Sequence, residues 1–104
     1  MNLVSVQIVE CLSNEPPGFV AAQLADAYGE KHTFYDKAPV FGCDPFDDDF
    51  ALPVAGWLGC EVVERFREAG RDLATIDTER PWDIESTKGH YRFVVEAEAV
   101  AEDS

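Results

Sequence analysis

The segment from Asp44 to Phe50 concentrates the residues of this chain that are best suited to binding chemistry. It reads Asp-Pro-Phe-Asp-Asp-Asp-Phe, so two aromatic rings bracket a run of three carboxylates. Carboxylates attract cations and basic proteins, and aromatic side chains supply the apolar contact area of tight interfaces. We predict that this acidic–aromatic segment binds a partner. Its binding residues are Asp44, Phe46, Asp47, Asp48, Asp49 and Phe50.

The spacing of these acids does not match a calcium-binding loop of the EF-hand type. Such a loop has acids at alternate positions, a glycine at the sixth position and a glutamate at the twelfth. Counted from Asp44, the sixth residue is Asp49 and the twelfth is Ala55. We therefore expect a solvated acidic loop that attracts cations weakly, and we predict no metal and no cofactor.

Trp82 marks a second candidate binding segment, in which Pro81 precedes it and Asp83 and Glu85 follow. A tryptophan at this place has two possible roles. It either fills one end of a barrel or stands exposed beside the acids as a second aromatic anchor. We include Trp82, Asp83 and Glu85 among the predicted partner-binding residues.

The residues for nucleophilic catalysis do not form a recognisable motif. His32 and His90 are the only histidines, and neither has a cysteine at a typical zinc-ligand spacing. The serines lack a Gly-x-Ser-x-Gly turn, and no glycine-rich phosphate loop is present. A dyad of Cys43 with a histidine and an acid is the best arrangement that the sequence offers. We expect both histidines to be exposed, and we favour a protein that is not an enzyme.

The charge of the chain narrows the class of partner. The chain has 21 Asp and Glu residues and 8 Lys and Arg residues, which gives it a net charge of −13. Of its 104 residues, 46% are hydrophobic. The apolar content indicates a folded core, so the charge must coat its surface. A compact acidic body repels nucleic acids and anionic membranes and attracts basic proteins. The N-terminal residues lack the pattern of a signal peptide, and we expect a cytoplasmic protein with reduced cysteines.

Alternation of apolar and polar residues predicts short β-strands in several places. The pattern is clearest at 4–8 and 91–98, and runs of strand-forming residues occur at 32–35 and 72–76. Residues 68–71 are typical of a hairpin turn, 78–86 form a connection around Pro81, and 39–53 form the longest irregular region.

Two segments, 19–28 and 58–69, suit either a strand or a helix. The alanines and Leu24 favour a helix in the first, but Gly29 indicates a hairpin turn directly after it. In the second, Gly56 and Gly59 would each cost a helix about 1 kcal/mol. We predict strands, although strict alternation then places Glu64 on the inner face. The chain 1–104 is predicted to be one all-β domain with room for one short helix. It would form a small antiparallel barrel or sandwich of five to six strands, for which an OB-like barrel is one suitable form.

Two stretches of the chain are distinctive. One reads DAYGEKHTF at 26–34 and continues with KAPV at 37–40; the other combines CEVV at 60–63 with TERPWDIES at 78–86. Together they resemble a family of small bacterial proteins of uncharacterised function. The resemblance implies an all-β domain and no particular activity. It also implies a glycine after the tryptophan, where this chain has Asp83.

We therefore expect a non-catalytic acidic binding module that docks on a basic protein. Its most concrete form is an immunity protein whose aspartates block the phosphate-binding cleft of a basic nuclease-type toxin. One alternative is a small enzyme or ligand-binding barrel with a site at one end, built around His32 or Cys43 and an acid. Another is a structural domain that dimerises through an edge strand.

Overall fold

The computed structural model describes residues 1–13, 15, 18–42 and 51–102, which form an antiparallel all-β fold with two 3-10 turns. This confirms the predicted class, and both ambiguous segments are strands. The strands are β1 (Asn2–Ser13), β2 (Phe19–Ala25), β3 (Lys31–Lys37), β4 (Val54–Glu68), β5 (Arg71–Asp77), β6 (Arg92–Glu96) and β7 (Val100–Glu102). The turns are η1 (Ala38–Phe41) and η2 (Ala97–Ala99). No helix among these residues has the length and apolar character needed to cross a bilayer.

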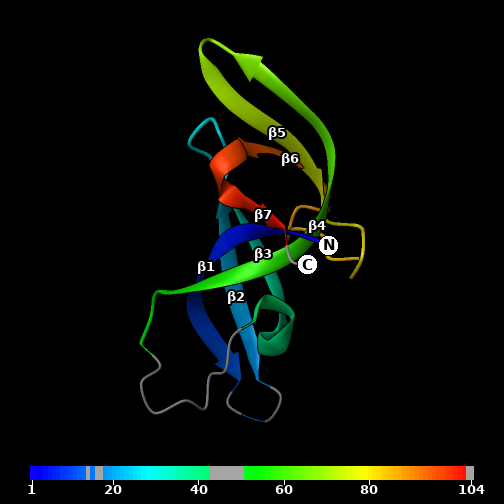
Figure 1. Ribbon diagram of the computed structural model, residues 1–104. Coiled ribbons are helices and arrows are strands. Elements are labelled where there is room, and N and C mark those ends of the chain that lie inside the picture. The colour runs from blue at the N-terminus through cyan, green and yellow to red at the C-terminus, as the bar shows by residue number, and fades with distance from the viewer. Residues whose placement is uncertain (14, 16–17, 43–50, 103–104) are drawn as a thin grey trace.

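The strands form one sheet in the order β3-β2-β1-β4-β5-β6, and β7 pairs with β1. The sheet curls into a half-barrel, and the long β4–β5 hairpin extends beyond it at the top of Figure 1. β1 and β4 are long strands, and each pairs with different strands along different parts of its length. β4 pairs with β1 through residues 54–60 and with β5 through residues 61–68.

The concave side of the sheet holds the hydrophobic core. On β1, Val4, Val6 and Ile8 are buried and the residues between them are exposed, which is the alternation expected of a strand with one face toward the core. Each such side chain, when fully buried, contributes about 1.5–3 kcal/mol relative to an exposed one. The other large buried side chains are Val20, Leu24, Phe34, Phe41, Leu58, Leu73, Ile76, Phe93 and Val95.

Two tight turns close the predicted hairpins. Gly29, at φ 84°, lies in the turn between β2 and β3, and Ala69 and Gly70, at φ 51° and 78°, connect β4 to β5. Consecutive left-handed residues are the signature of a type I′ turn, whose twist matches that of antiparallel strands. Both hairpins are therefore confirmed.

The prediction that Glu64 faces inward is wrong. The pairing of β4 with β5 shifts between Val62 and Glu64, where a bulge adds one residue to β4. The bulge resets the alternation, and Glu64 is exposed. An inward carboxylate is thus avoided by a change of register.

Candidate functional site

The acidic–aromatic segment 44–50 lies outside the described residues, and so does Cys43. The docking role predicted for Asp44, Phe46, Asp47, Asp48, Asp49 and Phe50 stays a prediction. The predicted site residues that the structure describes are Trp82, Asp83 and Glu85, in the connection between β5 and β6.

This connection is anchored at its base by Thr78. The Thr78 side chain is fully buried, and its hydroxyl donates to the carbonyl of Ile84 at 2.5 Å. The Ile84 amide donates back to the Thr78 carbonyl at 3.1 Å, and the Thr78 amide donates to the Tyr91 carbonyl at 2.9 Å. Ile84 and Ser86 are themselves buried. The residues between Thr78 and Ile84 therefore project from a fixed base.

Trp82 stands at the outer end of this projection and does not fill the barrel. Its side chain is 53% exposed, and one edge of the indole lies over Gly59 on β4. A Cβ atom on Gly59 would come within 2.7 Å of the indole nitrogen, so the absence of a side chain there makes room for the ring. Trp82 thus has one supported edge and one face in water.

Asp83 holds the turn after Trp82 in shape. Its φ is 56°, in the left-handed region, which aspartate tolerates better than most residues and which a glycine would adopt freely. The Asp83 amide donates to the Glu79 carbonyl at 2.8 Å. The Tyr91 hydroxyl donates to the Asp83 carboxylate, also at 2.8 Å. The carboxylate is therefore held at a defined place beside Trp82.

Three acids lie in the same loop as Trp82. Glu79, Asp83 and Glu85 are all exposed. The hydrogen bond to Asp83, partial burial and the charges of these three acids together raise the pKa of Tyr91 to about 12. We call Glu79, Trp82, Asp83, Glu85 and Tyr91 the Trp82 surface. Arg80 is exposed within the same loop, so the surface is predominantly but not uniformly acidic.

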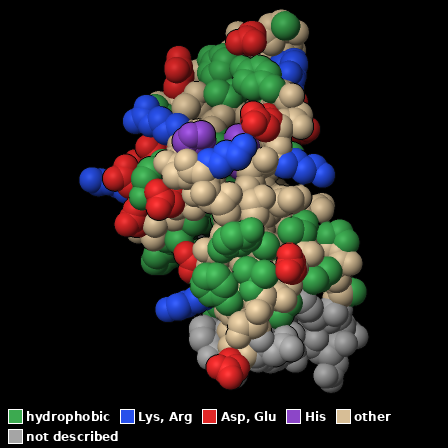
Figure 2. Space-filling view, turned by 180° about the vertical axis from the view of Figure 1, so that it is seen from behind, with side chains coloured by type: hydrophobic (Ala, Val, Ile, Leu, Met, Phe, Trp, Pro, Cys, Tyr) green, Lys and Arg blue, Asp and Glu red, His purple; other side chains and the backbone are tan. Residues whose placement is uncertain are grey.

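One face of the molecule carries charges of both signs. On the face shown in Figure 2, red carboxylates and blue basic side chains lie among hydrophobic patches, and several of the carboxylates lie close together at the left of the view.

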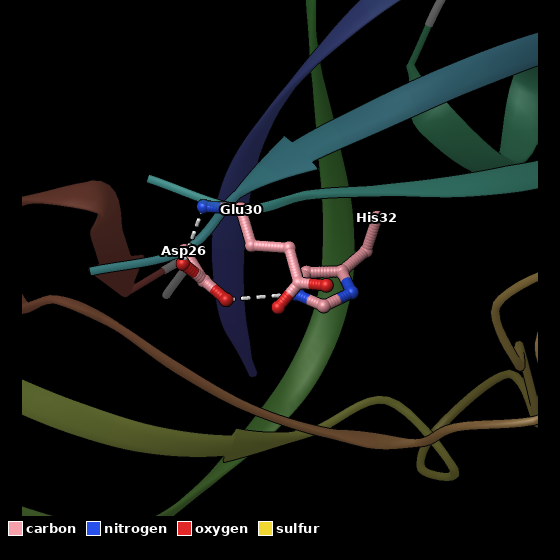
Figure 3. A group of neighbouring side chains, drawn as sticks. All are labelled: Asp26, Glu30 and His32. Atoms are coloured by element: carbon pink, nitrogen blue, oxygen red, sulfur yellow. Dashed lines mark hydrogen bonds and ion pairs between the residues drawn. The ribbon is translucent and has the colours of Figure 1, made fainter. Parts of the chain in front are cut away.

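A second cluster, which sequence reasoning missed, lies at the β2–β3 hairpin. Asp26, Glu30 and His32 each place a potential ligand atom within 4.8 Å of the others (Figure 3). The Asp26 carboxylate accepts from the backbone amides of Tyr28 and Glu30 through Oδ1, both at 2.9 Å. Its Oδ2 lies 2.8 Å from Nε2 of His32.

The environment of Asp26 favours its ionised form. Burial by itself would raise the pKa of this carboxyl, but hydrogen bonds from His32, Glu30 and Tyr28 and the charge of His32 outweigh it. The pKa is consequently lower than its ordinary value. The carboxylate is therefore available as an acceptor or ligand at neutral pH.

The expectation that both histidines are exposed is half wrong. His90 is exposed, whereas only 14% of the His32 side chain is accessible. His32 belongs to a strand that curls toward β6, where its ring contacts Phe93 at a centroid distance of 4.8 Å. The sequence does contain a signal for this cluster, which is the spacing Asp-x-x-x-Glu-x-His around the glycine turn. A hairpin brings residues on either side of its turn together.

Among the residues that the structure describes, the histidine cluster has no nucleophile within hydrogen-bond reach. Among the described residues, His32 hydrogen-bonds to Asp26 and to no serine, threonine or cysteine, so the pair lacks a nucleophile. Cys60 is a buried free thiol, and burial raises its pKa to about 11. A thiol with that pKa stays protonated at neutral pH and is a poor nucleophile.

A groove that could suit the ligand-binding alternative opens elsewhere, where β2 and β7 leave part of β1 uncovered. It has a volume of about 400 Å³ and contains Ser5, Gln7, Gln23 and Lys31 beside small apolar residues. Neither histidine lines this groove. The ligand-binding alternative expects a site built around His32, and this groove does not contain that site.

Comparison of this chain with protein-family models, with curated proteins and with solved structures finds no match. The resemblance to small bacterial proteins stays an expectation.

Proposed function

We propose that this protein is a non-catalytic binding module that docks on a basic protein through the Trp82 surface. The observation that carries the proposal is the position of Trp82, which is 53% exposed on an anchored loop and flanked by exposed carboxylates. An exposed aromatic ring on an anchored loop, beside fixed carboxylates, offers a partner both apolar contact area and charge to align with.

The two parts of the Trp82 surface have complementary tasks. Burying the exposed indole face in a partner supplies hot-spot binding energy, for which tryptophan is among the most effective residues. Glu79, Asp83 and Glu85 attract a basic partner and align it, which raises the association rate more than the final affinity. Such an interface weakens as salt screens the charges.

The loop is suited to docking because its geometry exists before binding. The Thr78–Ile84 hydrogen bonds hold its base, and the Tyr91–Asp83 hydrogen bond holds its tip. A pre-ordered loop loses little conformational entropy on association. The overall charge of −13 adds long-range attraction for any basic partner.

In its finer form, the proposal is that the partner is a basic nuclease-type toxin and the protein is its immunity protein. Carboxylates would then occupy the positions of substrate phosphates in the cleft of the toxin. This form rests on the charge of the chain and on the acids next to Trp82, with the segment 44–50 as an expected second contact.

The test is a comparison of two tryptophan variants in affinity capture from a lysate of the source cells. Trp82→Ala removes the proposed anchor, and Trp57→Ala removes a tryptophan that is 43% exposed on β4. We expect a basic protein to be retained by the wild type and by Trp57→Ala, lost with Trp82→Ala, and eluted by moderate salt. Equal retention by both variants, or retention that salt does not weaken, contradicts docking through this surface.

A purified captured protein then allows the finer proposal to be tested. If it is a nuclease, its activity on RNA or DNA should fall when one equivalent of the wild-type protein is added and should remain with Trp82→Ala. A captured basic protein without nuclease activity contradicts the immunity role and leaves the docking surface in place.

A further inference from the structure

We propose that Asp26, Glu30 and His32 form a binding site for one divalent transition-metal ion, with Zn²⁺ as its representative. The ligands are one oxygen from each carboxylate and Nε2 of His32 (Figure 3). Imidazole nitrogen combined with carboxylate oxygen is a donor set that Zn²⁺ and its first-row neighbours accept. The proposal is independent of the docking function.

The distances within the cluster suit a shared ion. Atoms bound to one tetrahedral zinc at about 2.0–2.2 Å lie about 3.3–3.6 Å apart from each other. Oδ2 of Asp26 and Nε2 of His32 are already 2.8 Å apart, so a small rotation of either group opens both to one ion. The third ligand atom, from Glu30, lies within 4.8 Å of the other two. Because Glu30 is exposed, its side chain is free to rotate into place.

Two of the three ligands are held in position by contacts outside the set. Oδ1 of Asp26 accepts from the amides of Tyr28 and Glu30, which leaves Oδ2 directed at the histidine. The His32 ring packs against Phe93, and its side chain and that of Asp26 are only 14% and 10% accessible. Supporting contacts of this kind orient ligands and strengthen metal binding.

Glu30 supplies an independent reason to place a cation here. Its backbone amide donates to Asp26, and its carboxylate lies within 4.8 Å of the ligand atoms of Asp26 and His32. In the described part of the chain, no hydrogen bond or ion pair is formed by the Glu30 carboxylate. A cation placed between these two carboxylates is attracted by both. Three protein ligands leave coordination positions for water, as in exchangeable sites.

Nuclear magnetic resonance provides the sharpest test because the chain has only two histidines. Zn²⁺ is titrated into the intact protein, and the ring-proton signals of His32 and His90 are followed. We expect the His32 signals to shift until one equivalent is bound, while the signals of exposed His90 stay in place. Equal shifts of both histidines, or no shift of His32, would overturn the proposal.

Matched variants separate a specific site from general attraction of cations by an acidic protein. Glu30→Gln should weaken Zn²⁺ binding at His32 at least tenfold, whereas Glu79→Gln, an equal loss of charge at another exposed position, should leave it unchanged. Because Glu30 is exposed, its substitution preserves the fold. His32→Gln should abolish binding, with circular dichroism as a check on folding. Equal affinities of the Glu30 and Glu79 variants would show that the cluster is only a hairpin clasp.

Discussion

The rings of His32 on β3 and Phe93 on β6 lie with their centroids 4.8 Å apart and their planes inclined at 53°. These residues belong to the two end strands of the sheet, which do not pair with each other within the described residues. Phe34, also on β3, contacts Phe93 on the same seam between the two strands, at a centroid distance of 5.6 Å in an edge-on arrangement. Side chains rather than a hydrogen-bond ladder therefore close the half-barrel.

Backbone hydrogen bonds cover parts of the edges of β3 and β6, the two strands on either side of this seam. The amide of Ala27 donates to the carbonyl of Val94 on β6, and the amide of Thr87 donates to the carbonyl of Thr33 on β3, both at 2.8 Å. Arg71 on β5 donates to the Ala27 carbonyl at 2.6 Å and pairs with Glu96. Turns thus cover parts of the edges that would otherwise invite pairing with another chain.

Truncation of Phe93 should be among the most damaging substitutions in the chain. Phe93 is 4% exposed and contacts both His32 and Phe34, so Phe93→Ala leaves a cavity in the seam. We expect a loss of about 3–5 kcal/mol in the free energy of unfolding, measured by urea denaturation. Tyr35→Ala, at a position 54% exposed on β3, is the aromatic control and should cost about 0.5 kcal/mol or less. Similar losses in the two variants would show that the seam does not stabilise the fold.

Adding a methyl group at Gly59 should move Trp82. The new Cβ would lie 2.7 Å from the indole nitrogen, and the exposed indole is free to swing away. In a Trp57→Phe background, Gly59→Ala should shift Trp82 fluorescence to longer wavelength and increase its quenching by acrylamide. An unchanged emission spectrum would contradict the described contact.

Gly56→Ala is the matched control for Gly59→Ala on the same strand. Its Cβ would meet the carbonyl oxygen of Phe41 at 2.9 Å and the side chain of Ile8 at 3.2 Å. Neither neighbour is free to leave, because one is backbone and the other is core. We expect Gly56→Ala to lower the free energy of unfolding by about 1–3 kcal/mol without moving the emission of Trp82.

The β4–β5 turn can be improved at Ala69. This residue holds a φ of 51° directly before Gly70, and alanine adopts the left-handed region at a cost. Asn-Gly is the preferred pair for such a turn. Ala69→Asn should therefore raise the free energy of unfolding by about 0.5–1 kcal/mol, whereas Gly70→Ala should lower it. A loss of stability in Ala69→Asn would argue against the type I′ geometry.

Alkaline pH should destabilise the protein through Cys60, whose side chain is only 2% exposed. Burial raises its pKa from 9.0 to about 11, so the folded protein retains the thiol proton more tightly than the unfolded chain does. The corresponding stability is fully present below pH 9 and is lost as the pH rises toward 11. The full effect is on the order of 2–3 kcal/mol.

Urea denaturation at pH 8, 9 and 10 measures this loss, and the Cys60→Ala variant is the control. The wild type should become less stable across this range, and the variant should change less. Parallel curves for the two proteins would assign the alkaline effect to other groups.

Local pattern alone predicted much of the fold. The alternation at 4–8, the glycine in the β2–β3 turn and the Ala-Gly pair after Glu68 indicated strands and hairpins because these features depend on neighbouring residues. The position of Glu64 was predicted incorrectly because a bulge depends on the partner strand. The same limit applied to Trp82, whose exposure follows from a loop anchored on Thr78 and from open space above Gly59.

The amino-acid sequence by itself determined the all-β class, the hairpins, the excess of negative charge and the identity of the candidate anchors. Each of these follows from residue type or from spacing over a few positions. Only the tertiary structure decided that His32 is covered by Phe93 and joined to Asp26, and that Trp82 faces water among carboxylates. These relationships arise from the curl of the sheet, which brings together residues far apart in the chain, and no local pattern encodes that curl.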